Sequence, residues 1–321
     1  MADFSVISPS PHIHSGNRTD RLMYTVAIAL IPALLTGVYF FGARVLLLTI
    51  TSIIACLVFE YLIQRFILKQ PISITDGSAV VTGLLLSLNL PSSLPLWIVV
   101  IGALVAIGIG KMSFGGLGKN IFNPAIVGRV FLLISFPAQM TTWPLPENHL
   151  LDLDSASGAT ILTAIKSSPN IHLDMLPLLI GERAGSIGET GAIALLIGLI
   201  ILLVRKVITW HIPVSIVVSA FVTAAIFHWI DPEHYIPPHF QILAGGLLLG
   251  AFFMATDYVT SPMTPKGMLI YGCGIGVITI LIRSFGSYPE GVSFAILIMN
   301  AFTPLINTFI HPKRFGGGQK R

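Results

Sequence analysis

Long apolar runs separated by short polar breaks make up most of the chain between residues 22 and 310. A helix needs about 20 apolar residues to cross the core of a bilayer, and fewer when it is broken or partnered inside a bundle. By this criterion the pattern predicts ten membrane segments, at residues 22–41, 45–62, 79–90, 94–109, 124–136, 191–204, 212–229, 242–255, 268–282 and 292–310. We therefore expect an all-α polytopic membrane protein with about ten transmembrane helices.

Several of these segments, notably 79–90 and 124–136, are too short to span about 30 Å at 1.5 Å per residue. Pro91 closely follows the first segment, and the pair Asn123-Pro124 precedes the second. Proline interrupts helices because it lacks a backbone donor and its ring clashes with the preceding turn. We predict that both segments are half-length helices, beside which unwound backbone faces the protein interior.

The distribution of basic residues predicts the orientation, because cytoplasmic loops carry an excess of lysine and arginine. With a cytoplasmic N-terminus, the cytoplasmic segments hold 13 of these residues and the outer segments hold four. The long polar connection 137–189 then lies outside, between a first half at 22–136 and a second half at 190–310. The segments 1–21 and 311–321 are expected to be cytoplasmic.

Each half contains an odd number of predicted spans, so a repeat of five plus five helices has to be inverted. Two short similarities support such a repeat. Gly-Leu-Leu-Leu occurs at 83–86 and again at 246–249, and a basic residue shortly precedes Phe-Gly at 111–115 and at 283–286.

Composition restricts the class of protein. Only 10% of the residues are charged, 54% are hydrophobic, and the mean hydropathy is +0.86. A typical soluble domain carries about 25% charged residues, so a soluble enzyme, a disordered protein and a nucleic-acid binder are excluded. The net charge of +4 is spread singly over short polar breaks and forms no basic face. Residues 1–20 lack the features of a secretory signal, so we expect the first apolar run to remain in the mature protein.

Cysteine and histidine offer little chemistry. Cys56 and Cys273 both lie in apolar runs, which gives no disulfide framework and no iron–sulfur ligand set. The nine histidines show no metal-ligand spacing. We therefore expect no metal site and assign the cysteines to packing.

The outer connection contains the sequence Asp154-Ser-Ala-Ser157-Gly158-Ala159-Thr160. One explanation is a polar turn that leads into a helix, with Ser157 as N-cap and Gly158 relieving backbone strain. Asp-x-x-Ser-Gly-Ala-Thr also resembles the acceptor motif of flavin transferases, which join FMN through its phosphate to the threonine hydroxyl. In that case Gly158 and Ala159 leave Thr160 sterically accessible, and Asp154 helps the modifying enzyme to orient the acceptor.

Further motifs extend the resemblance over most of the chain. In order, they are Thr75-Asp-Gly-Ser-Ala79, Phe114-Gly-Gly-Leu-Gly118, Asn120-Ile-Phe-Asn-Pro-Ala125, Gly188-Glu-Thr190, Met254-Ala-Thr-Asp257, Tyr288-Pro-Glu-Gly291 and Met299-Asn-Ala-Phe-Thr-Pro304. Together they resemble the family of the D subunit of the Rnf ion-translocating ferredoxin:NAD oxidoreductase complex, to which the B subunit of the sodium-translocating NADH:quinone reductase is also related. The short N-terminal segment 1–21 favours the Rnf member.

The resemblance implies a membrane electron-transfer subunit with FMN bound covalently to Thr160. Its Rnf-type complex, a translocase, would couple electron transfer from ferredoxin to NAD⁺ to the movement of Na⁺ or H⁺. The chain lacks a dinucleotide fingerprint and a cysteine cluster, so we assign it no catalytic residue and expect other subunits to bind NAD and ferredoxin. A flavin transferase is the expected partner during maturation. The expected location is the bacterial cytoplasmic (inner) membrane, with both termini cytoplasmic and the flavin loop extracytoplasmic.

Asn120 and Asn123 flank the predicted break before the segment 124–136. Their side-chain amides can cap backbone groups at the start of a helix. In the resembling quinone reductase subunit, this region is associated with a second, non-covalent flavin, riboflavin. Both explanations stay open from the sequence.

Four acids lie at the mouths of predicted spans: Asp76, Glu189, Asp257 and Glu290. A carboxylate at membrane depth is costly unless it is paired or hydrated, which makes each of them a functional candidate. Asp76 and Asp257, beside predicted breaks on the cytoplasmic side, are our candidates for an ion pathway, although capping or pairing explains each acid equally well. Arg129 can pair with an acid or with a flavin phosphate.

Broken helices and inverted repeats also build the substrate sites of transporters. The resemblance further implies a urea-transporter-like scaffold, so a solute channel or transporter subunit is the alternative function. A third hypothesis is a structural anchor for redox subunits, which requires Thr160 to stay unmodified. The acceptor motif discriminates, because a passive channel has no use for a flavin outside the membrane.

Overall fold

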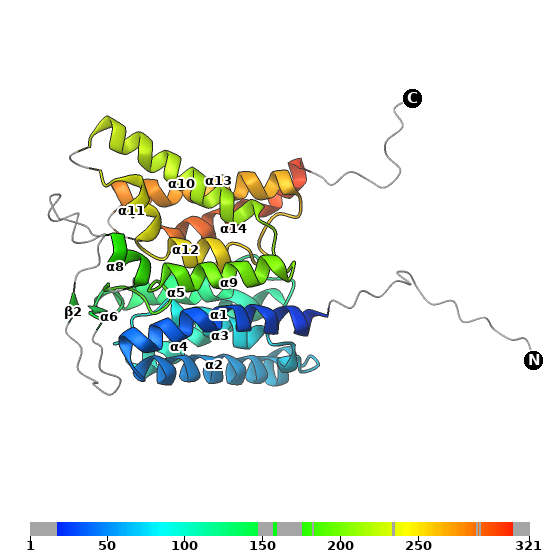
Figure 1. Ribbon diagram of the computed structural model, residues 1–321. Helices are drawn as coiled ribbons and strands as arrows, with labels where there is room; N and C mark the ends of the chain where they lie inside the picture. The colour runs from blue at the N-terminus through cyan, green and yellow to red at the C-terminus, as the bar shows by residue number, and fades with distance from the viewer. Residues whose placement is uncertain are drawn as a thin grey trace, which may run out of the picture.

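The computed structural model describes residues 18–146, 157–158, 175–181, 183–232, 235–286, 288 and 290–310. Most helices in this part of the chain run roughly along one axis, as Figure 1 shows. The strands described are β1 (Trp143–Pro144) and β2 (Ser157–Gly158), which pair antiparallel. The expected all-α fold is confirmed.

The helices before the long connection form the first half of the bundle. They are α1 (Thr19–Phe41), α2 (Arg44–Leu62), η1 (Ile63–Leu68), η2 (Ile74–Asp76), α3 (Ser78–Leu88), α4 (Leu96–Val105), η3 (Ala106–Lys111), η4 (Met112–Phe114) and α5 (Pro124–Ser135), followed by the short α6 (Pro137–Met140). The helices after the connection are α8 (Met175–Ile180), α9 (Ala192–Val204), α10 (His211–Ile230), α11 (Pro238–Leu243), α12 (Leu247–Leu249), η5 (Gly250–Met254), α13 (Pro265–Phe285) and α14 (Val292–Phe309).

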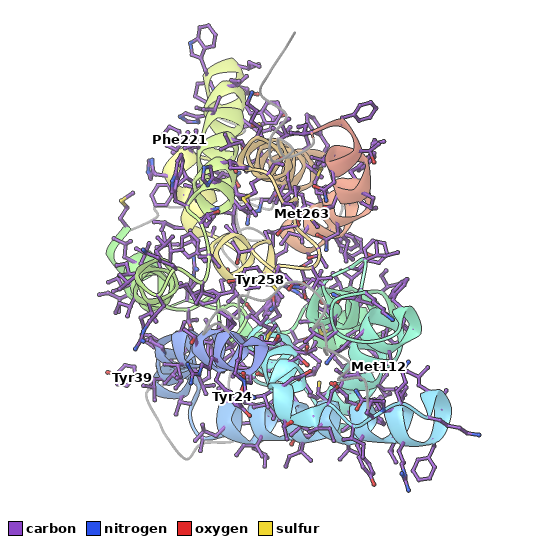
Figure 2. The ribbon with its side chains drawn as sticks, turned by 90° about the vertical axis from the view of Figure 1, so that its right-hand side faces the viewer. Tyr24, Tyr39, Met112, Phe221, Tyr258 and Met263 are labelled. Carbon is purple, nitrogen blue, oxygen red and sulfur yellow. The ribbon has the colours of Figure 1, made fainter. Side chains whose placement is uncertain are left out.

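Six helices in the described residues are long and apolar enough to cross a membrane: Thr19–Phe41, Arg44–Leu68, Leu96–Phe114, His211–Ile230, Pro265–Phe285 and Val292–Phe309. Three shorter apolar helices, α3, α5 and α9, accompany them. Large hydrophobic side chains project outward around the bundle, among them Tyr24, Tyr39 and Phe221 in Figure 2. The protein is therefore a polytopic membrane protein.

Several predicted segments differ from the structure, among them 45–62, which continues through η1 to Leu68. The segment 242–255 is divided between α11, α12 and η5, because the chain leaves the helix around Gly245. That residue has a φ of 69°, a left-handed conformation that favours glycine. The segment 94–109 extends further than expected, to Phe114, through the π-helical turn η3 and the 3-10 turn η4.

The two halves pack as inverted units. α1 begins and α14 ends at the same end of the bundle, on the right in Figure 1, which we call the terminal end. α6, α8 and β2 lie at the opposite end, the loop end. α1 packs against α9, which runs in the opposite direction, and α5 packs against α14. An inverted repeat of five plus five helices has this arrangement.

The short sequence similarities occupy matching positions in the two halves. Lys111 ends η3 and donates a hydrogen bond to Ser78, at the start of the half-length helix α3. Arg283, near the end of α13, bonds in the same way to Gln241 in α11, which leads into the broken helix of the second half. Each half therefore holds a buried basic residue against its broken helix.

α3 ends inside the bundle, where nearly all of its side chains are buried. Beyond this end, the backbone carbonyls of Leu88 and Leu90 accept hydrogen bonds from the backbone N–H groups of Gly188 (2.7 Å) and Ile187 (3.1 Å). The segment before α9 thus replaces helical hydrogen bonds that the break removes. The prediction of a half-length helix beside unwound backbone that faces the protein is confirmed for α3.

The contact between α1 and α9 depends on a glycine. Gly198 lies so close to the backbone carbonyl of Ala29 and the ring of Phe253 that a Cβ atom would overlap both. Small residues let membrane helices approach this closely.

We predict that Gly198→Ala pushes the two halves apart and destabilises the protein by about 1–3 kcal/mol, the usual cost of overpacking. Thermal unfolding of the detergent-purified protein measures the effect. Gly108→Ala is the matched control, because a Cβ there meets only Cδ1 of Ile63, at 3.7 Å. Equal unfolding temperatures for the two variants would contradict the prediction.

Candidate functional site

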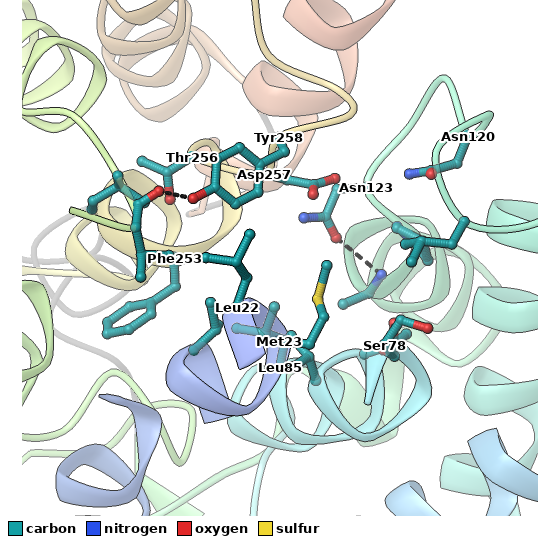
Figure 3. Close-up of a pocket in the computed structure, with 18 of the residues that line it drawn as sticks. Leu22, Met23, Ser78, Leu85, Asn120, Asn123, Phe253, Thr256, Asp257 and Tyr258 are labelled. Carbon is teal, nitrogen blue, oxygen red and sulfur yellow. Dashed lines mark hydrogen bonds between the residues drawn. The ribbon is translucent and has the colours of Figure 1, made fainter. Parts of the chain in front are cut away.

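An open pocket lies at the terminal end, and its lining comes from both halves. We call it the terminal pocket. Leu22 of α1 and Leu85 of α3 form one side of it, with Phe253 of η5 beside them, while polar residues of the loops lie across from them in Figure 3. An apolar pocket with a few convergent polar groups is the usual form of a ligand site.

Asn123 fixes α5 to the second half of the protein. Its Oδ1 accepts hydrogen bonds from the backbone N–H groups of Ala125 (3.0 Å) and Ile126 (3.4 Å), and its Nδ2 donates to the backbone carbonyl of Met254 (3.1 Å). The capping explanation is therefore confirmed for Asn123. These bonds occupy most of its amide, so its first role is to shape the terminal pocket.

Asn120 keeps a polar atom available for a ligand. The side chain is buried, and its Nδ2 donates to the backbone carbonyl of Phe122 (3.2 Å). Its Oδ1 has no hydrogen-bond partner among the residues that the structure describes. Leaving a buried acceptor unpaired costs free energy, so a pocket ligand with an N–H or O–H donor would be stabilised here.

Asp257 lines the same pocket and is half-buried. Burial raises the pKa of its carboxyl above the ordinary value. Hydrogen bonds from Thr260, from the backbone amides of Val259 and Tyr258, and from the Asn120 side chain lower that pKa without cancelling the rise. Asp257 therefore keeps its proton to a higher pH than a free aspartic acid does.

Asp76 lies next to the terminal pocket but not in its lining. It accepts hydrogen bonds from the backbone N–H of Ser78 (2.8 Å) and from the Ser78 hydroxyl (2.5 Å), which confirms the capping explanation. Through that hydroxyl it is linked to Lys111. Asp76 is absent from the pocket lining that includes Asp257, so the structure does not bring the two predicted ion-path residues together at the pocket.

Glu60 was not among the residues expected at a site, and Lys111 was assigned only to the cytoplasmic charges and to the repeat. The structure pairs them inside the bundle, at 2.7 Å between Lys111 Nζ and Glu60 Oε2. A single acid in the apolar run 45–62 was the available signal, because a buried acid needs a partner. The partner lies 51 residues further along the chain, which no local pattern reveals.

A second, smaller hollow lies at the loop end. It is lined by Arg129, Trp143, Tyr288 and Glu290, together with Leu133, Met140 and Thr141. Arg129 forms a buried ion pair with Glu290 and donates a hydrogen bond to Oδ1 of Asn89 (2.7 Å). Pairing of Arg129 with an acid is therefore confirmed. Oε1 of Glu290 has no hydrogen-bond partner within the described part of the chain.

Glu189, another acid predicted at the mouth of a span, is also paired. Its carboxylate lies 3.8 Å from the guanidinium of Arg183, and both side chains are buried. Ser186 adds hydrogen bonds of 3.4 Å from its backbone N–H and its hydroxyl. Glu189 and Glu290 thus both fit the pairing interpretation.

The predicted flavin attachment motif is described only in part. Three of its residues lie outside the described residues: Asp154, Ala159 and Thr160. Ser157 and Gly158 form β2, and Gly158 pairs with Trp143 of β1. Because Trp143 lines the loop-end hollow, the described part of the motif lies beside that hollow.

Comparison with known proteins gives a match over nearly the whole chain. The sequence model of the NQR2, RnfD, RnfE family matches residues 6–316. The chain is 44% identical to the D subunit of the proton-translocating ferredoxin:NAD(+) oxidoreductase complex of Clostridium ljungdahlii, over 97% of this chain and 96% of that protein. It is 44% identical to the D subunit of the Na(+)-translocating ferredoxin:NAD(+) oxidoreductase complex of Acetobacterium woodii, over 97% and 95%. The D subunit of the ion-translocating oxidoreductase complex of Stutzerimonas stutzeri is 40% identical, over 92% of each chain.

We predict that Arg129→Leu destabilises the protein by about 3–5 kcal/mol, because the buried carboxylate of Glu290 loses its direct ion-pair partner. Thermal unfolding in detergent measures the loss, and Arg129→Leu combined with Glu290→Leu should recover a large part of it. Arg18→Ala is the control, since its ion pair with Asp20 is exposed and worth at most about 1 kcal/mol. An Arg129→Leu variant that unfolds at the wild-type temperature would contradict the predicted role of the buried ion pair.

Proposed function

Because the chain belongs to the NQR2, RnfD, RnfE family, we propose that it is the electron-carrying membrane subunit of an ion-translocating ferredoxin:NAD⁺ oxidoreductase complex of the Rnf type. The observation that carries this proposal is 44% identity to the D subunits of two such complexes over almost the full length of each chain. The other subunits of the complex are its partners. They would bind ferredoxin and NAD, for which this chain carries neither a cysteine cluster nor a dinucleotide fingerprint.

The covalent cofactor in this proposal is FMN, bound to the Thr160 hydroxyl through its phosphate by a flavin transferase. The motif Asp154-Ser-Ala-Ser-Gly-Ala-Thr160 supports it. The pairing of Gly158 with Trp143 gives further support, because it brings this part of the connection beside the loop-end hollow. That hollow offers the aromatic rings of Trp143 and Tyr288, which suit a planar ring. The flavin would supply one-electron chemistry that no side chain offers.

The terminal pocket is the proposed site of a second, non-covalent flavin, riboflavin. Its apolar walls suit the faces of a flavin ring, and the unpaired Oδ1 of Asn120 suits an N–H donor at the ring edge. Asn123 holds the loop in place through Met254. These residues would bind and orient the ring and exclude water from its faces.

The terminal end is proposed to face the cytoplasm of a bacterium, and the loop end to face outward across the inner membrane. The excess of basic residues at the predicted cytoplasmic segments supports this orientation. Asp76 and Asp257 then lie at the cytoplasmic end, where they remain the proposed residues of an ion path for Na⁺ or H⁺.

A solute channel on a urea-transporter-like scaffold is the second candidate. The observation that favours it is the pair of broken helices, α3 and α12 with η5, which come together inside the bundle where Asn89 bonds Met254. A channel of this kind would carry no covalent flavin.

We predict that the denatured polypeptide, expressed with its flavin transferase, fluoresces under ultraviolet light in a gel and that Thr160→Ala abolishes the signal. Denaturation removes non-covalent flavin, so the band reports the covalent bond alone. Thr163→Ala, three residues further along the same loop, should stay fluorescent. A dark wild-type band beside a labelled positive control would favour the channel.

We predict that the complex releases riboflavin when it is denatured with acid, and that Asn120→Leu lowers the amount about tenfold because the ring edge loses its acceptor, worth about 1.4 kcal/mol. Chromatography of the released flavins measures it. Asn307→Leu changes the same residue type outside the pocket lining and should leave the riboflavin content unchanged. If the two variants released equal amounts of riboflavin, Asn120 would not be part of the riboflavin site.

A further inference from the structure

Lys111 places a positive charge in the wall of the terminal pocket. Its Nζ donates hydrogen bonds to Oε1 and Oε2 of Glu60 (2.8 and 2.7 Å) and to Oγ of Ser78 (2.5 Å). All three side chains are buried, and Lys111 and Glu60 are at most 1% exposed. Lys111 and Ser78 also line the terminal pocket. A pocket ligand and Glu60 are therefore neighbours of the same lysine.

Two carboxylates are connected to this lysine by hydrogen bonds, one directly and one through a hydroxyl group. Glu60 pairs with it directly, and the Ser78 hydroxyl, which accepts from Lys111, donates in turn to Oδ1 of Asp76 (2.5 Å). Gln64 adds a hydrogen bond of 3.3 Å to Oε1 of Glu60. The charge of the Lys111 ammonium group is consequently neutralised in part by Glu60 of α2, which lies outside the pocket lining.

Irregular helical turns make this contact between distant parts of the chain. Lys111 is the last residue of the π-helix η3, and Glu60 stands three residues before the π-helix η1. Such π turns widen a helix locally and are frequent at functional sites. The Lys111–Glu60 contact thus joins the end of one membrane helix to a position near the end of another, and a π turn lies at each of these ends.

The other charged side chain in the described lining is Asp257. Burial raises the pKa of its carboxyl, so it opposes an anionic ligand less than an ordinary aspartate does. Lys111 is the basic residue in that lining, and it is the group that can attract negative charge on a bound ring.

We infer that Lys111 is a positioning residue that stabilises negative charge on the ligand of the terminal pocket, and that Glu60 limits how much of the lysine charge reaches that ligand. The inference rests on the proposed function for the identity of the ligand as a flavin. An electron delivered by the redox partner without a proton adds one negative charge to the ring. A buried ammonium group attracts that charge more strongly than an exposed one, because water screens it less.

The two members of the pair then have opposite effects on the reduction potential of the pocket flavin. Lys111→Met removes the attraction and should lower the potential, whereas Glu60→Gln releases the lysine charge and should raise it. We expect about a tenfold change in the equilibrium between the oxidised and reduced ring in each case, which is 59 mV for a one-electron couple. If the Lys111–Glu60 pair only supported the fold, both variant complexes would instead lose riboflavin.

The experiment uses the purified complex with Thr160→Ala as background, so that this chain carries no covalent flavin. Spectroelectrochemical titration gives the potential of the pocket flavin, and acid release gives its amount. Lys119→Met is the matched control, because Lys119 is exposed, lies outside the pocket lining and is eight residues away. It should leave the potential unmoved, and Lys111→Arg, which keeps the charge, should restore a potential near that of the wild type.

Lys111→Met can fail to assemble, since it leaves Glu60 buried without a partner. The double variant Lys111→Met/Glu60→Gln removes both charges and should still lower the potential, because the lysine is the member of the pair that lines the pocket. Retained riboflavin with an unmoved potential, or shifts of the same sign in the Lys111 and Glu60 variants, would overturn the inference alone. A wild-type complex that releases no riboflavin would overturn the proposed ligand and the inference together.

Discussion

A chain that crosses a membrane must satisfy its backbone hydrogen bonds within the protein, and the rest of this structure depends on how it does so where α3 ends. The carbonyl of Leu88, the last residue of α3, and that of Leu90 just beyond it accept hydrogen bonds from the N–H groups of Gly188 and Ile187. Those donors lie near the end of the long connection, shortly before α9. α3 can stop inside the bundle because this distant segment of the chain satisfies the carbonyls at its end.

Side chains extend this junction toward both ends of the molecule. Asn89, directly after α3, bonds Arg129 and the sulfur of Met254 (3.4 Å), and Asn123 bonds the carbonyl of the same methionine. Asn123 lines the terminal pocket, and Arg129, paired with Glu290, lines the loop-end hollow. A hydrogen-bonded series thus connects the two hollows through the centre of the bundle.

The sequence predicted those features that local composition decides. Long apolar runs are sufficient for helices such as α1 and α10, and Asn123-Pro124 marked the start of a half-length helix with its cap. The break around Gly245 escaped prediction because apolar residues on both sides make 242–255 look like one span, although the pair Gly245-Gly246 is a turn signal. The Glu60–Lys111 pair escaped because its members are far apart in sequence, and only the fold shows that Asn120 leaves an acceptor free.

We propose that this chain carries one flavin at each end of a packed bundle. A cryo-electron microscopy map of the assembled, oxidised complex tests this most directly. We predict density for a planar three-ring group in the terminal pocket, within hydrogen-bond distance of Asn120 Oδ1, and a second such group joined to the Thr160 side chain. A bare Thr160 together with a lipid chain or partner side chains in the terminal pocket would contradict the account.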